Sequence, residues 1–197
     1  MSDAETLAVY ARQRDTYATM MDEEAKRDEV IAPFIAACPQ GGRVLDLGCG
    51  PGHFARRMAD GGLEVHAWDA VPEMVEYAAR QPGVTARQAR FEDLNTENAY
   101  DGIWAYFSLL HAPRTDFPRH LAAIAEALKP GGVFVLGVKR GSGGERDSLG
   151  RHYEYYEQPE LDTALQNVGL TPTRHWTGIA PGLSGHPSGW IAILARA

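Results

Sequence analysis

The stretch VLDLGCGPG, residues 44–52, decides the fold. It begins as an apolar run interrupted by Asp46, and it then places three glycines at alternate positions, Gly48, Gly50 and Gly52. Glycine permits a sharp turn and leaves main-chain atoms open to a ligand that a Cβ would block. Ligands of open α/β sheets lie at the carboxyl ends of the strands. The pattern predicts a strand over 43–47, a turn that is either a ligand site or simply tight, and a helix over 53–59.

Short β-rich runs alternate with helical stretches around this turn, which is typical of a parallel α/β sheet. Further strands are predicted over 63–68, 84–88, 102–106, 133–138, 171–177 and 189–195, and helices over 4–21, 22–37, 72–80, 116–128 and 159–168. Pro33 is expected to kink the helix that holds it. The segment 139–151 contains four glycines and is predicted to be a mobile loop, and 178–188 is predicted to be the loop between the last two strands. The prediction is one doubly wound α/β domain over residues 1–197, with a helical cap over 1–40.

Composition narrows the class of protein. The chain has 197 residues, of which 44% are hydrophobic, so a packed core is expected rather than disorder. The formal net charge of −7 argues against binding to nucleic acid or to an anionic membrane. Two cysteines, Cys38 and Cys49, make no disulfide framework, and no signal peptide or membrane segment is apparent. A cytoplasmic protein is expected.

The residues around the turn indicate what kind of ligand it holds. A dinucleotide fingerprint places its third glycine three residues after the second, where this chain has His53. The Asp46 carboxylate disfavours a pyrophosphate and favours a ligand with a positive centre. Asp69 follows the predicted second strand, 21 residues after Gly48 (69 − 48), where a ribose-binding acid belongs. Asp69 alone is equally readable as a helix N-cap, but together with the turn it favours a ribose ligand.

Four segments, VLDLGCGPG (44–52), VHAWDA (65–70), FEDL (91–94) and LKPGG (128–132), resemble the class I S-adenosylmethionine-dependent methyltransferases. The resemblance covers about residues 43–138. It implies a Rossmann-like sheet of seven strands with an antiparallel last strand, and S-adenosyl-L-methionine as the cofactor. It further implies a set of cofactor-binding residues: Tyr17, Asp46, Gly48, Gly50, Gly52, Asp69, Ala70, Phe91, Glu92 and Ala105.

The resemblance gives these residues distinct roles. The three glycines line the methionine and ribose, Asp46 lies near the methionine, and Asp69 holds the ribose hydroxyls. Phe91 and Glu92 border the adenine, and Ala105 offers a carbonyl to the methionine amino group. Family members often carry an acidic residue at the position of Arg90, so adenine contacts here fall to the backbone or to Glu92.

Two tyrosines suggest a lid over the cofactor. Tyr10 and Tyr17 are seven residues apart and share one helical face. Relatives often place a tyrosine-bearing N-terminal helix over the cofactor. By this resemblance, Tyr17 is expected to hydrogen-bond to the methionine carboxylate. Packing of both rings on the core is the alternative.

The molecule that receives the methyl group is expected to bind near the end of the fourth predicted strand, under a lid formed by residues 139–160. His111 is the candidate general base, with a packing role as its alternative. Tyr106 and Ser108 are weaker candidates for the base. Tyr106, Lys139, Arg151 and Tyr153 are the candidate substrate-binding residues. Lys139, Arg146 and Arg151 suit an anionic acceptor, and a solvated charged loop is the alternative. No metal is expected, because the seven histidines are scattered.

The sequence therefore predicts a methyltransferase that uses S-adenosyl-L-methionine and acts on a small molecule. Two alternatives stay open: an NAD(P)-dependent oxidoreductase, and a non-catalytic module that binds S-adenosylmethionine.

Overall fold

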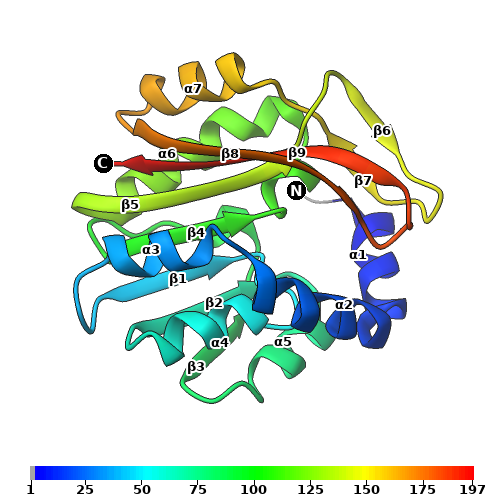
Figure 1. The fold of residues 1–197 in the computed structure, drawn as a ribbon, viewed down its shortest axis with the longest axis horizontal. Helices are drawn as coiled ribbons and strands as arrows, with labels where there is room; N and C mark the ends of the chain where they lie inside the picture. Colours follow the sequence, from blue (N-terminus) through cyan, green and yellow to red (C-terminus); the bar gives the residue numbers. More distant parts are fainter. Residues whose placement is uncertain (1–2) are drawn as a thin grey trace.

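One seven-stranded sheet organises the computed structural model, which describes residues 3–197. Its strand order is β3-β2-β1-β4-β5-β9-β8 (Figure 1), and β9, the last strand of the chain, runs antiparallel to β5. The predicted fold class is confirmed. The strands are β1 (Arg43–Leu47), β2 (Glu64–Asp69), β3 (Val84–Gln88), β4 (Tyr100–Tyr106), β5 (Leu128–Lys139), β8 (Thr171–Pro181) and β9 (Pro187–Arg196).

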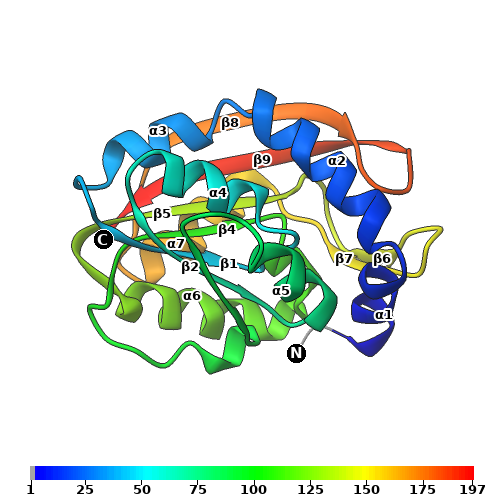
Figure 2. The same ribbon diagram turned by 90° about the horizontal axis from the view of Figure 1, so that it is seen from below.

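Helices cover both faces of the sheet and bury one core on each (Figure 2). Helices α3 and α4 pack on one face, and α6 and α7 pack on the other, so the central strands are apolar on both sides. No helix among residues 3–197 is long and apolar enough to cross a membrane. The helices are α1 (Ala4–Arg12), α2 (Arg14–Arg27), α3 (Ile31–Ala37), α4 (His53–Asp60), α5 (Pro72–Ala78), α6 (Phe117–Ala127) and α7 (Gln158–Asn167).

The predicted helix over 22–37 is wrong, because the chain turns at Asp28. That residue has extended backbone angles, and its Oδ1 accepts hydrogen bonds from the amides of Val30 (2.8 Å) and Ile31 (2.9 Å). The carboxylate thus caps the start of α3 and separates it from α2. Pro33 lies in the first turn of α3, where its missing N–H is not needed, so it does not kink a helix.

We expect Asp28→Ala to lower the free energy of unfolding by about 2 kcal/mol. The substitution removes the cap of α3 and also the acceptor of the Tyr106 hydroxyl, which donates to Oδ2 at 2.8 Å. Asp28→Asn keeps an acceptor for the cap and should cost less. Urea denaturation of both variants checks this, and equal stability of Asp28→Ala and the unchanged protein would contradict it.

The region after β5 is more ordered than the predicted loops. Strand β5 already begins at Leu128, within the segment expected to close α6, and residues 139–151 are no free loop. They contain β6 (Gly144–Arg146), which pairs antiparallel with β7 (His152–Glu154). Strands β8 and β9 likewise pair from Thr171 to Arg196, which leaves only a short connection between them. The β6–β7 hairpin, α1 and α2 gather at the carboxyl ends of the parallel strands (Figure 1).

Candidate functional site

The glycine turn connects β1 to α4 in a conformation that needs glycine. Gly48 (φ 81°) and Gly50 (φ 53°) are left-handed, and the amide of Gly48 donates to the Trp68 carbonyl at 2.8 Å. A Cβ on Gly48 would lie 2.3 Å from Cβ of Ser108. Gly52 differs from its predicted role: a Cβ there would meet Ala78 of α5 at 2.8 Å, so this glycine permits helix packing and does not line the ligand cavity.

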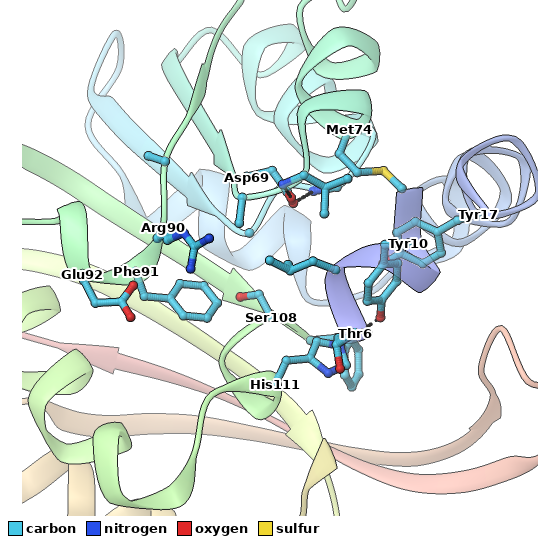
Figure 3. A pocket seen from close by; sticks show the side chains of 17 residues that line it. Thr6, Tyr10, Tyr17, Asp69, Met74, Arg90, Phe91, Glu92, Ser108 and His111 are labelled. Carbon is cyan, nitrogen blue, oxygen red and sulfur yellow. Dashed lines mark hydrogen bonds between the residues drawn. The ribbon is translucent and has the colours of Figure 1, made fainter. Parts of the chain in front are cut away.

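A cavity of about 670 Å³ opens beside this turn, between the ends of β1, β2, β3 and β4 (Figure 3). We call it the first cavity. Its lining includes Thr6, Tyr10, Tyr17, Gly48, Gly50, Asp69, Ala70, Met74, Arg90, Phe91, Glu92, Phe107, Ser108 and His111.

Asp69 is the carboxylate at the wall of the first cavity. It ends β2, and backbone amides fix it: Gly50 donates to Oδ2 and Val71 donates to Oδ1, both at 2.8 Å. Burial raises the pKa of this carboxyl group, and the amide bonds oppose that effect. The residue therefore locks the glycine turn while its remaining lone pairs stay available to the hydroxyl groups of a ligand.

Asp46 is the second carboxylate, on β1 next to Trp104 of β4. Its side chain is 3% exposed, and no group within residues 3–197 hydrogen-bonds to its Oδ2. Desolvation, with a smaller contribution from Asp69, raises the pKa of Asp46 to about 8. A buried carboxylate oxygen without a partner costs free energy, and a cationic ligand group would remove that cost.

Tyr10, His111 and Arg151 form a buried network at the edge of the first cavity. His111 donates from Nδ1 to the carbonyl of His152 at 2.6 Å, so its Nε2 accepts from the Tyr10 hydroxyl at 2.9 Å. Arg151 Nη1 donates to the same hydroxyl oxygen at 3.0 Å. Burial lowers the pKa of His111 to about 4, so the ring is neutral at neutral pH. Both of its nitrogens are engaged in this arrangement.

A second cavity of about 780 Å³ adjoins the first and shares Tyr10, Tyr17, Gly48 and Phe107 with it. Aromatic and aliphatic side chains dominate its lining, with a few charged groups among them. The lining includes Met20, Met21, Glu24, Asp46, Phe54, Trp104, Tyr106, Leu110, Lys139, Arg151, Tyr153, Leu183 and Trp190.

The predicted site residues divide between the two cavities. Ala70, Phe91 and Glu92 line the first cavity, and Tyr17 lines both. The second cavity is also lined by Asp46, Tyr106, Lys139, Arg151 and Tyr153. Two predicted residues lie elsewhere. Gly52 packs against α5, and Ala105 is fully buried within β4, away from both linings.

Arg146 is also placed differently from the expectation of an acceptor contact. It pairs with Asp3 (3.1 Å) and Glu5 (3.3 Å), and so ties the β6–β7 hairpin to the start of α1.

Sequence reasoning missed the contribution of α2 to the second cavity. Tyr17, Met20, Met21 and Glu24 are spaced three, four and seven residues apart, which is one face of a helix. That spacing was available in the sequence, and the predicted helix boundary at residue 21 concealed it.

The segment that carries the glycine turn matches the family described as methyltransferase domain over residues 44–132. The ubiquinone biosynthesis O-methyltransferase of Xanthomonas axonopodis pv. citri (strain 306) is 39% identical over 105 residues, covering 50% of this chain and 43% of that protein. Residues 44–132, which are 89 of the 197 residues, are thus similar to methyltransferase domains.

Two other proteins extend the likeness over nearly the whole chain. The S-adenosyl-L-methionine-dependent Diels-Alderase iccD of Talaromyces variabilis is 32% identical over 192 residues, covering 89% of this chain and 62% of that protein. The chain thus spans less than two thirds of these curated relatives. The structure of Burkholderia thailandensis 1,6-didemethyltoxoflavin-N1-methyltransferase shares the fold, with a TM-score of 0.70, 24% identity, and coverage of 96% of this chain and 87% of that chain.

The first cavity has features that suit S-adenosyl-L-methionine. The backbone at Gly48 and Gly50 is open to a ligand. Asp69 presents carboxylate oxygens for hydroxyl groups, and the buried Asp46 oxygen next to the turn calls for a cation.

Proposed function

We propose that this chain binds S-adenosyl-L-methionine in the first cavity and transfers its methyl group to a small molecule in the second. The single observation that supports this most strongly is that two cavities adjoin at one sheet edge and share Tyr10, Tyr17, Gly48 and Phe107. Two ligands bound there would meet at the shared wall.

In this proposal the chain holds the cofactor through groups already oriented. Asp69 accepts from the ribose hydroxyls, and Phe91, with Ala70 and Glu92, borders the adenine. Asp46 lines the second cavity beside the shared residue Gly48, so the methionine part reaches this wall and its ammonium pairs with Asp46. Tyr17, which lines both cavities, covers that part from α2. These assignments use charge and shape that the cavity provides before any ligand binds.

A bound S-adenosyl-L-methionine supplies a methyl group that its sulfonium has already activated. The work of the chain is then to align the acceptor and to exclude water. The aromatic walls of the second cavity serve the second task, and Tyr106, Lys139, Arg151 and Tyr153 are the proposed acceptor contacts. Residues 139–160, including the β6–β7 hairpin, form the lid in this proposal.

In this proposal His111 positions the hydroxyl group of Tyr10. As its Nε2 accepts from the Tyr10 hydroxyl, it fixes that hydroxyl at the wall common to both cavities. A direct role as general base requires the Tyr10 bond to open first. We further propose a cytoplasmic protein without nucleic-acid partners, in keeping with the net charge of −7.

Calorimetric titration tests the cofactor assignment, and a product assay tests the reaction. We expect S-adenosylmethionine and S-adenosylhomocysteine to bind and NADH not to bind. Formation of S-adenosylhomocysteine with a panel of small acids, phenols, amines and thiols would then identify acceptors. Binding of NADH alone would refute the proposal.

A second candidate is a cyclisation that uses bound S-adenosylmethionine without transferring its methyl group. The observation that favours it is the Diels-Alderase likeness over 89% of this chain, together with the large aromatic second cavity. Turnover of a polyene substrate with no S-adenosylhomocysteine formed would select this candidate. The non-catalytic module remains if neither product appears.

Cofactor affinity should depend on pH through Asp46. Its pKa of about 8 means that the carboxyl is largely protonated at pH 6, whereas pairing with an ammonium favours the carboxylate. Binding therefore releases a proton, and affinity for S-adenosylhomocysteine should rise about tenfold or more from pH 6 to pH 8. Calorimetry across that range checks this. Asp46→Asn should flatten the profile, and an unchanged slope in that variant would contradict the assignment.

A further inference from the structure

Lys139 is an ammonium group in the second cavity that lacks a counter-ion. It is the last residue of β5, it is half-buried, and its Nζ lies 3.9 Å from the centre of the Tyr153 ring. Within the described chain, residues 3–197, no carboxylate lies within 4 Å of Nζ and no hydrogen bond is made by it. In a chain with net charge −7, a half-buried cation without a carboxylate calls for an anion from outside.

The neighbouring cation, Arg151, is already neutralised. Its Nε and Nη2 donate to Oδ2 of Asp147 at 3.0 and 2.6 Å, and its Nη1 donates to Tyr10. The side chain is 2% exposed, so it cannot turn toward a new partner without breaking these bonds. It therefore adds positive potential beside Lys139 and leaves the anion-binding role to the lysine.

The acidic groups around Lys139 are also committed to other partners. Glu145 on β6 accepts from the Tyr155 hydroxyl at 2.7 Å, and Asp147 accepts from Arg151 at 2.6 Å. Desolvation and the charge of Arg151 lower the pKa of Lys139, while Asp147 and Glu145 oppose that effect. An anion bound at Nζ would compete with neither of these bonds.

The other side chains that line the second cavity indicate the chemical class of the uncharged part of the ligand. Phe54, Trp104, Tyr106 and Trp190 supply aromatic surface for an aromatic ligand. Trp104 is fully buried and its Nε1 has no hydrogen-bond partner within the described residues, so it offers one donor to a ligand oxygen.

Glu24 makes the end of the second cavity at α2 negative, opposite in charge to Lys139. This carboxyl group lies on α2 and lines the second cavity together with Tyr17 and Tyr106. Its charge contributes to the raised pKa of both tyrosines. Negative potential at α2 disfavours an anionic group on that side and favours it at the end of β5. One ligand charge at Lys139 thus fixes which end of the molecule points away from α2.

We propose that the molecule bound in the second cavity is an aromatic compound with one anionic group, and that Lys139 is the residue that recognises this group. The proposal rests on the function proposed above, since that function makes this cavity the acceptor site. Carboxylate, sulfonate and enolate share the required chemistry. The lysine is a specificity-determining residue here and takes no part in the methyl transfer itself.

Two fluorescent probes test this without knowledge of the natural acceptor. 8-Anilinonaphthalene-1-sulfonate carries one anionic group, and N-phenyl-1-naphthylamine is the same aromatic body without it. Both are titrated into the full chain, with and without saturating S-adenosylhomocysteine. We expect Lys139→Gln to weaken binding of the sulfonate about tenfold or more, and to leave binding of the neutral probe within about twofold. Lys139→Arg should restore most of the loss.

Arg140→Gln is the matched control. It removes the same charge one residue further on, from a side chain that pairs with Glu157 at 3.1 Å outside the cavity. It should leave both probes unaffected. Since Lys139 has no protein counter-ion, Lys139→Gln should also keep or raise the melting temperature, whereas a structural role would lower it.

The outcomes separate the two proposals. Equal loss of both probes, or no loss of the sulfonate probe in Lys139→Gln, overturns the anion site. If S-adenosylhomocysteine does not bind, the proposed function fails, and the comparison of probes without it still decides the role of Lys139.

Discussion

Replacing Asp69 with alanine is expected to lower the affinity for S-adenosylhomocysteine about 100-fold or more. Two separate losses add up. The ribose hydroxyls lose their charged acceptor, and the Gly50 and Val71 amides lose the carboxylate that holds them at 2.8 Å. Hydrogen bonds to a charged group contribute about 1.5–3 kcal/mol each, and about 2.7 kcal/mol corresponds to 100-fold.

Calorimetry gives the affinity, and Glu73→Ala serves as the control. Glu73 lies in the first turn of α5, only four residues along the chain, and does not line either cavity. Asp69→Asn keeps an acceptor for one amide and removes the charge, so its affinity for S-adenosylhomocysteine should lie between those of Asp69→Ala and Glu73→Ala. Unchanged affinity in Asp69→Ala would remove the ribose assignment and, with it, the main support for the cofactor site.

Gly48→Ala is the second large effect, and it acts on folding as well as binding. At φ 81° any Cβ is strained by about 1–2 kcal/mol, and the Cβ would also lie 2.3 Å from Cβ of Ser108. Relief requires a shift of β1 or of the backbone at Ser108, whose Oγ donates to the Leu47 carbonyl at 2.6 Å. We expect a loss of about 3 kcal/mol or more in the free energy of unfolding, together with loss of cofactor binding.

Gly131→Ala separates the two causes. Gly131 has nearly the same backbone angle, φ 77°, and a Cβ there would meet no described atom within 4 Å beyond its chain neighbours. It therefore reports the conformational strain alone, and the difference between the variants reports the clash with Ser108. Adding Ser108→Gly to Gly48→Ala should restore part of the stability. Equal losses in the two single variants would show that the clash does not exist.

The sheet and the glycine turn could be predicted because each depends on local patterns. Apolar runs flanked by glycine or acidic residues define the strands, and Asp69 was found from its distance to Gly48. The assignment of Gly52 failed for a different reason. Its contact, Ala78, is remote in sequence, so spacing alone does not tell a packing glycine from one that lines a ligand cavity.

The two regions that flank the cavities were harder to predict. A single side chain, Asp28, ends one helix and starts the next through two hydrogen bonds, and helical periodicity does not register such a cap. The β6–β7 hairpin consists of three-residue strands among glycines and charges, and its strands pair only with each other. The role of Arg151 depends on Tyr10, 141 residues away, a contact that only the folded chain reveals.

The wall formed by Tyr10 and Tyr17 has a thermodynamic consequence. One ligand that presses on these rings changes the affinity for the other, and linkage makes the factor identical in both directions. Saturation with S-adenosylhomocysteine should therefore shift the dissociation constant of a second-cavity ligand by the same ratio as the reverse titration. The two sites would then behave as one cooperative unit whose communication passes through a pair of phenol rings.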